Sequence, residues 1–110
     1  MHRNTWKQGE RRIAEMFGTR RTPLSGGNSG HTRSDTLHLD LFIEVKHSKK
    51  YPKEILVNKT FKEAKNEAKI PLLVFLKLNS PEPLVLCKLK DLKEISKKMI
   101  FEGKKVAHEI

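Results

Sequence analysis

Residues 35–46 read DTLHLDLFIEVK, and this stretch decides how the rest of the chain folds. Apolar side chains stand at every second position from Leu37 to Val45, with polar side chains between them except at Phe42. Because side chains alternate between the two faces of a strand, the pattern predicts extended structure with one buried face. Two arrangements fit it: one long strand, or a tight hairpin that turns near residues 38–40.

Residues 4–17 predict a helix before this stretch. Asn4 or Thr5 can cap the helix, and Gly18 ends it. At the helical period its apolar side chains fall on one arc, and Glu10 lies in the middle of that arc. Between the helix and residue 35 we expect a short strand over 18–24 and a flexible, glycine-rich loop over 25–34.

Downstream, residues 58–69 predict a second helix, with Asn58 as its N-cap and Pro71 as its stop. Residues 72–78 are almost all apolar, as is typical of a central strand covered on both faces. Residues 84–89 predict a strand that pairs antiparallel with it. The remaining segments are a basic loop over 47–57 and a last helix over 90–99.

The order of these elements predicts one α/β domain over residues 1–110. Helix, three strands, helix and strand follow one another, which is the order αβββαβ, and a further strand and helix come after them. The strand ending at Lys46 and the strand over 72–78 are joined by a helix, so they form a βαβ crossover. We therefore expect a mixed central sheet flanked by helices.

The charge of the chain points to an anionic partner. Its 110 residues include 23 Lys and Arg against 13 Asp and Glu, a net charge of +10. This excess favours binding to a nucleic acid, although a ribosome-associated or merely soluble basic protein has the same balance. No apolar run approaches the roughly 18 residues of a membrane helix, and no secretory signal is present. With a single cysteine as well, we expect an intracellular, cytoplasmic protein without a membrane partner.

The sharpest local feature is Glu44-Val45-Lys46. Residues two apart on a strand point to the same face, so Glu44 and Lys46 project together while Val45 points into the core. A carboxylate beside an ammonium group suits a hard metal ion and a nucleophilic water. The pattern is also common in surface ion pairs, so it needs support from other residues.

Three further acids supply that support. Glu10 lies on an apolar helix stripe, where an unpaired charge is expensive, and Asp35 and Asp40 lie shortly before Glu44. In an unbroken strand Asp40 would share a face with Glu44, whereas Asp35 would point away. A hairpin at residues 38–40 would instead place Asp35 on a neighbouring strand, beside Glu44. We favour the hairpin and Asp35, with Asp40 as the alternative.

Together, Glu10, Ser25-Gly26, Ser34-Asp35 and Glu44-Val45-Lys46 resemble the motif of the PD-(D/E)xK nuclease superfamily. Within it, the chain is similar to the small Holliday-junction resolvases of archaeal and phage type. Ser34 stands where the superfamily motif has proline. The resemblance implies a restriction-endonuclease-like αβββαβ core.

The resemblance also implies a role for each motif residue. Asp35 and Glu44 would bind a divalent metal, Mg²⁺ with Mn²⁺ able to substitute, and the main-chain carbonyl of Val45 would complete the site. Lys46 would be the catalytic lysine, and Glu10 would orient a water or a second metal. The reaction would be endonucleolytic hydrolysis of DNA phosphodiester bonds, selective for branched or four-way-junction DNA.

Two other functions stay open at this point. One is a nicking or single-strand-specific nuclease on the same core. The other is a non-catalytic basic nucleic-acid-binding domain, although such a domain has no use for acids that face phosphate. The residues we expect to contact DNA are Arg20, Arg21, Ser25, His31, Arg33, His47, Lys49, Lys50, Lys62, Lys65 and Lys69.

A resolvase must cut two strands symmetrically, which predicts a homodimer. Its interface would come from apolar residues near the C-terminus that the core does not need. These are Met99, Ile100, Phe101, Val106 and Ile110.

Overall fold

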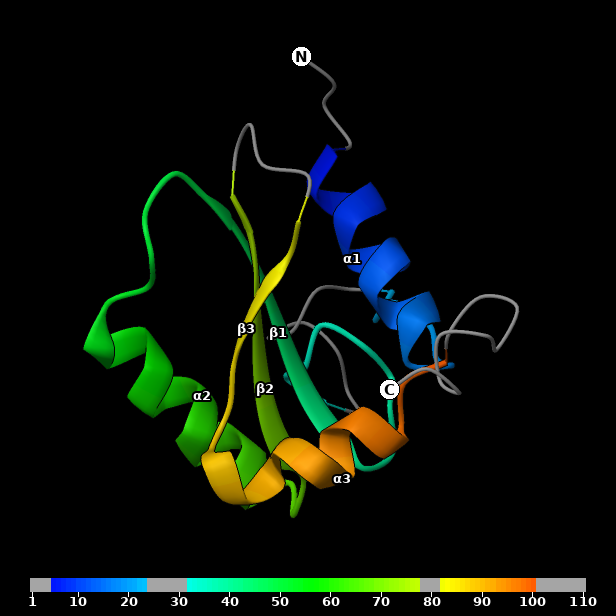
Figure 1. Cartoon of the computed structure of the whole chain (residues 1–110), viewed down its shortest axis with the longest axis vertical. Helices are drawn as coiled ribbons and strands as arrows, with labels where there is room; N and C mark the ends of the chain where they lie inside the picture. Colours follow the sequence, from blue (N-terminus) through cyan, green and yellow to red (C-terminus); the bar gives the residue numbers. More distant parts are fainter. Residues whose placement is uncertain (1–4, 24–31, 78–81, 101–110) are drawn as a thin grey trace.

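A computed structural model describes residues 5–23, 32–77 and 82–100 of the chain (Figure 1). In the described part, helices and strands alternate as expected of an α/β domain, and no helix is long and apolar enough to cross a membrane. The elements are α1 (Thr5–Met16), β1 (Leu41–Ser48), α2 (Glu54–Asn66), β2 (Ile70–Lys77), β3 (Leu84–Leu86), the 3₁₀ turn η2 (Leu89–Asp91) and α3 (Leu92–Lys97).

Strand β2 is the centre of the sheet, whose order is β1-β2-β3. It pairs parallel with β1, from Leu41 opposite Ile70 to Ser48 opposite Lys77. On its other edge it pairs antiparallel with β3. Since α2 joins the two parallel strands, the βαβ crossover and the antiparallel partner predicted from the sequence are both confirmed.

The apolar core lies mainly on one face of this sheet. Alternate side chains of β1 and β2 pack there against α1 and α3, as the strand periodicity requires. On the opposite face, α2 packs its buried Thr60 and Ala64 towards the sheet. Figure 1 accordingly shows α1 and α2 on opposite sides of the strands. The core cluster consists of Ile13, Phe17, Leu41, Ile43, Val45, Leu72, Val74 and Ile95.

The chain turns back on itself before β1, so of the two arrangements the hairpin is the one observed. The N–H of Asp35 donates to the carbonyl of Ile43 over 2.8 Å. At the turn, Nδ1 of His38 accepts hydrogen bonds from the backbone N–H of Asp40 at 2.9 Å and of Leu41 at 3.0 Å. The imidazole therefore caps the turn from which β1 begins.

The sheet has fewer strands than predicted in the described residues. Of the three strands expected over 18–46, only β1 forms, and the others shrink to one isolated antiparallel bridge between Arg21 and Thr36. Pro23 limits the first of them, because proline lacks the N–H that a ladder needs. The αβββαβ prediction is thus correct for the order of the segments but wrong for the extent of two strands.

Helix α2 begins four residues earlier than predicted. Its N-cap is Lys53, which has an extended backbone, and Asn58 is an exposed residue inside the helix. Residues 54–57 join the helix because Leu56 and Val57 gain partial burial there. Pro71 is not the stop but a buried residue of β2. It is tolerated because β3 pairs only with residues 73–75, which leaves that edge of β2 without a β3 partner at Pro71.

The C-terminal elements are shorter than predicted, and they change the expected dimer surface. Met99 packs against the core of its own chain. The N–H of Ile100 donates to the carbonyl of Met16 over 2.7 Å, and its side chain remains 54% exposed. Of the five proposed interface residues, Met99 is therefore partly used within the domain. Phe101, Val106 and Ile110 lie outside the described residues.

Ser34 is fully buried and ties the hairpin to β1. Its hydroxyl accepts a hydrogen bond from the N–H of Ile43 at 2.9 Å and donates to the carbonyl of Ile43 at 3.1 Å. Its own carbonyl accepts from the hydroxyl of Thr22 at 2.9 Å. One side chain thereby satisfies both backbone groups of a strand residue and fixes the position of the next residue, Asp35.

Replacing Ser34 with alanine should destabilise the protein by about 1–3 kcal/mol, because the N–H of Ile43 would lose a buried partner. Urea unfolding followed by circular dichroism measures this change. Ser96→Ala is the matched control, since Ser96 is exposed and its hydroxyl donates to the carbonyl of Lys93 in the same helix. Its cost should stay within about 0.5 kcal/mol. Equal losses in the two variants would contradict the role of Ser34.

Candidate functional site

Glu44 and Lys46 project from the same face of β1, as the alternation predicted. Nζ of Lys46 lies 3.3 Å from Oε2 of Glu44, and the Glu44 side chain is 16% exposed against 41% for Lys46. The intervening Val45 is buried in the core. The strand therefore presents a largely covered carboxylate with an accessible ammonium group beside it.

The hairpin brings Asp35 to this pair. Oδ2 of Asp35 accepts a hydrogen bond from the N–H of Val45 at 2.7 Å, so its carboxylate lies along the exposed edge of β1. Asp40, the alternative, is directed elsewhere. Its side chain is 61% exposed and pairs with Nζ of Lys98 at 3.2 Å. Of the two acids, Asp35 is the one that the fold places next to Glu44.

Glu10 approaches the same edge from α1. It is only 7% exposed, and its Oε1 accepts from Nε of Arg21 at 2.8 Å. The neighbouring Gly9 packs closely against the sheet, since a Cβ there would lie 2.4 Å from the ring of His47 and 2.6 Å from Leu76. Both contacts are with the ends of side chains, so a larger residue at position 9 would require His47 and Leu76 to move.

The three acids act on one another electrostatically. Burial, followed by the charge of Asp35, raises the pKa of Glu44 to about 7, although Lys46 opposes the shift. Burial also raises the pKa of Asp35 to about 6, with a further contribution from the charge of Glu10 and an opposing one from the N–H of Val45. The pKa of Glu10 is raised by burial against the pull of Arg21. The fold thus holds three acids where their ionised forms are disfavoured.

The donor set fits a hard divalent cation bound by few protein groups. Among residues 5–23, 32–77 and 82–100, no three His, Cys, Asp or Glu side chains form a group that could hold a metal ion. Mg²⁺ needs less than that, since it keeps several waters and is commonly held by one or two carboxylates. Asp35 and Glu44 can supply these, and a positive ion would relieve their repulsion. A ligand role for the carbonyl of Val45 remains a prediction.

Most residues predicted to contact DNA are at the surface. Arg21 is an exception, because its guanidinium pairs with Glu10 and lies over the Trp6 ring at 5.3 Å. His47 and Lys69 are half-buried, and Ser25 and His31 lie outside the described residues. The exposed members of the set are Arg20, Arg33, Lys49, Lys50, Lys62 and Lys65.

Two basic clefts adjoin the acids. One, of about 360 Å³, extends from Lys46 past Lys50 and Lys53 to the exposed ring of Tyr51. The other, of about 340 Å³, is lined by Arg11, Arg20 and Arg21 among others. Each cleft contains the cation that pairs with one of the acids, Lys46 with Glu44 and Arg21 with Glu10.

Sequence reasoning missed three contributions to this site. The sequence marks Ser34 only as a departure from the family motif and Arg21 only as a DNA contact, and it gives Gly9 no role. A buried Glu10 requires a cationic partner, which was a usable signal for Arg21. Nothing in the local pattern identifies the bonds of Ser34, because they join segments nine residues apart.

No model of a protein family matches the chain, and no curated protein or solved structure is significantly similar to it.

The raised pKa values predict that the site destabilises the metal-free protein at high pH. Folded Asp35 and Glu44 keep protons that the unfolded chain releases between about pH 4 and about pH 7, so their contribution to stability falls as the pH rises through that range. Glu44→Gln should remove part of this penalty. Relative to wild type, it should be more stabilising at about pH 8 than at about pH 5 in urea unfolding with EDTA.

Glu15→Gln removes an exposed acid from the same domain and is the control. Its effect should differ little between the two pH values. A Glu44→Gln effect that is independent of pH would show that this carboxylate is not held in a disfavoured charged state.

Proposed function

We propose that the chain is a metal-dependent DNA endonuclease of the PD-(D/E)xK type. The observation that carries this proposal is the convergence of Asp35, Glu44 and Lys46 at one edge of the sheet, with Glu10 behind them. Burial raises the pKa of all three acids, and the charge of a neighbouring acid adds to each shift, which costs stability and serves no purpose in packing. A domain that only binds nucleic acid gains nothing from carboxylates among the cations that approach phosphate.

Each side chain would have one task. Asp35 and Glu44 would hold the Mg²⁺ or Mn²⁺ ion, which when bound would polarise the phosphodiester and lower the pKa of a coordinated water. Lys46, held by Glu44 at 3.3 Å, would stabilise negative charge that develops on the phosphate. Glu10, fixed by Arg21, would orient water near the carboxylates.

The substrate we propose is branched DNA, such as a four-way junction. The net charge of +10 and the two basic clefts beside Lys46 and Arg21 support contact with phosphate backbone from more than one direction. Symmetric cleavage of a junction would need two such domains, so the proposal includes a homodimer.

A single-strand-specific nuclease is the second candidate, and one observation favours it. Tyr51 is 60% exposed in the cleft that begins at Lys46. An accessible aromatic ring offers a stacking surface for an unpaired base, which is a common device in single-strand binding. Lys77 lies over the ring at 4.8 Å and Phe75 contacts it in a T-shaped arrangement, so a base would have to stack on the part of the ring that these contacts leave exposed.

Glu44→Gln and Lys46→Ala should each reduce cleavage by at least about 100-fold, because each removes a group that acts on the reacting phosphate. The assay uses labelled four-way junction, flap, duplex and single-stranded DNA with Mg²⁺, and DNA binding is measured in parallel. Binding should persist in both variants. Asp40→Asn is the control and should cleave like wild type, since Asp40 pairs with Lys98.

Full cleavage by either variant, or undiminished cleavage in EDTA, would contradict the nuclease proposal. If Asp40→Asn is inactive and Asp35→Asn is active, the metal ligand before β1 is Asp40 and the proposed assignment is wrong. Preference for single strands over junctions would select the second candidate.

Metal binding can also be tested without catalysis. Mg²⁺ or Mn²⁺ should raise the melting temperature of the wild type, because an ion that binds only the folded state stabilises it by about 2.7 kcal/mol at 100 times its Kd. Asp35→Asn and Glu44→Gln should lose most of this shift, whereas Asp40→Asn should keep it. An equal shift in all four proteins would indicate non-specific binding and count against the site.

A further inference from the structure

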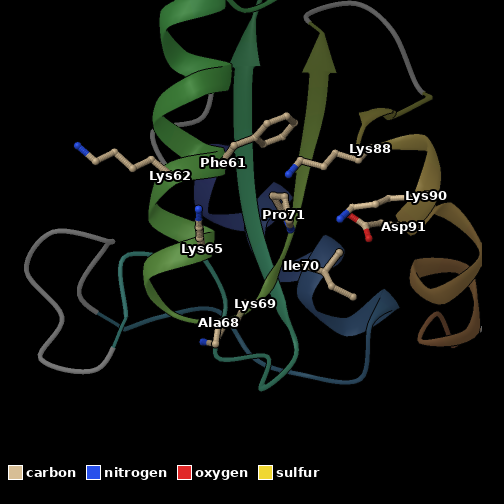
Figure 2. A pocket seen from close by; sticks show the side chains of 10 residues that line it. All are labelled: Phe61, Lys62, Lys65, Ala68, Lys69, Ile70, Pro71, Lys88, Lys90 and Asp91. Atoms are coloured by element: carbon tan, nitrogen blue, oxygen red, sulfur yellow. The ribbon is translucent and has the colours of Figure 1, made fainter.

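A third basic feature, besides the clefts at Lys46 and Arg21, lies along α2. It is a groove of about 630 Å³ between α2 and the segment that follows β3. Its floor is formed by apolar residues at the start of β2, and its walls carry five lysines against one acid, Asp91 (Figure 2). The lysines are Lys62, Lys65, Lys69, Lys88 and Lys90.

The side chains of this groove converge from two separate elements. Figure 2 shows Lys88 and Lys90 reaching from the segment after β3 towards Pro71 and α2, while Phe61 extends from α2 to meet them. Nζ of Lys88 lies 5.2 Å from the centroid of the Phe61 ring, a cation–π contact that orders both. Lys62 extends away from the floor. The groove is therefore lined chiefly by Lys65, Lys88 and Lys90.

Its charges are largely uncompensated. Lys69 pairs with Glu67 at 3.2 Å, but in the described part of the chain Lys62, Lys65, Lys88 and Lys90 have no carboxylate within ion-pair distance. Like charges gathered on one surface disfavour the free protein. A bound polyanion would remove that repulsion, whereas an apolar or cationic partner would not.

The groove is separate from the acid cluster. The residues that line it include none of Glu10, Asp35, Glu44 and Lys46. On α2, Glu63 lies near enough to Glu44 to add a small contribution to its raised pKa, of which burial is the main cause. Lys62 and Lys65, on either side of Glu63 in sequence, line the groove instead. Helix α2 thus contributes Glu63 near the acids and Lys62 and Lys65 to the groove.

We propose that this groove binds a second segment of DNA backbone, away from the segment presented to the acids. The identity of the polyanion as DNA rests on the proposed function. The lysines themselves fit any regularly spaced row of phosphates, because Lys acts as a point charge without demands on geometry. A branched molecule supplies two backbone segments at an angle, so the groove would favour junctions over short linear duplexes.

The test compares two triple variants that lose the same charge. Lys65→Gln, Lys88→Gln and Lys90→Gln alter the groove, and Lys59→Gln, Lys93→Gln and Lys97→Gln alter exposed lysines elsewhere on α2 and α3. Fluorescence anisotropy measures binding to a four-way junction and to a short duplex at several salt concentrations in EDTA. Melting curves check that both variants fold like wild type.

We expect the groove variant to bind the junction at least about tenfold more weakly, with a salt slope shallower by about 2 to 3, since each neutralised phosphate contributes about −0.9. The control should stay within about twofold of wild type on the same scale. Equal losses in the two variants, or an unchanged slope in the groove variant, would overturn the proposal.

The outcome is distinct from that of the nuclease test. If no protein cleaves DNA but the groove variant alone loses junction binding, the groove proposal stands and the nuclease proposal fails. If wild type and groove variant bind equally and both cleave, the nuclease proposal stands and the groove proposal fails.

Discussion

The hydrogen bonds between residues 34–36 and strand β1 are the constraint on which the site depends. Through its hydroxyl, Ser34 holds both backbone groups of Ile43, and Asp35 accepts from the N–H of Val45 at 2.7 Å. Thr36 of the same segment forms a β-bridge with Arg21. Nε of Arg21 in turn donates to Oε1 of Glu10 on α1 over 2.8 Å. A change at Ser34 would therefore move Asp35 and Arg21 together, and with them the partner of Glu10.

This arrangement stores an electrostatic cost that the core must offset. Alternate residues of β1 have opposite roles, since Ile43 and Val45 are buried in the core while Glu44 and Lys46 face the site. Burial raises the pKa of Glu44 to about 7, so the same packing that stabilises the strand disfavours its charged carboxylate. Sites of this kind persist where a ligand or reaction requires them.

Much of this could be predicted from the sequence, and the failures have a common cause. Periodicity predicts the shared face of Glu44 and Lys46, the buried β2 and the burial of Glu10, because each follows from local spacing. The start of α2, the lost strand over 18–24 and the role of Ser34 depend on bonds between distant segments. The sequence predicts that the α2 lysines contact DNA, but it does not show that Lys88 and Lys90 lie beside them. That placement depends on the antiparallel pairing of β3 with β2.

The proposed chemistry depends on a metal site formed by Asp35 and Glu44 at the edge of β1. Nuclear magnetic resonance with paramagnetic Mn²⁺ tests it most directly, because a bound ion broadens the amide signals nearest to it. Substoichiometric Mn²⁺ should broaden the signals of Asp35, Glu44 and Val45 first, and Glu44→Gln should prevent this. Broadening centred instead on Asp40 and Glu94, two exposed acids that both pair with Lys98, would contradict this assignment.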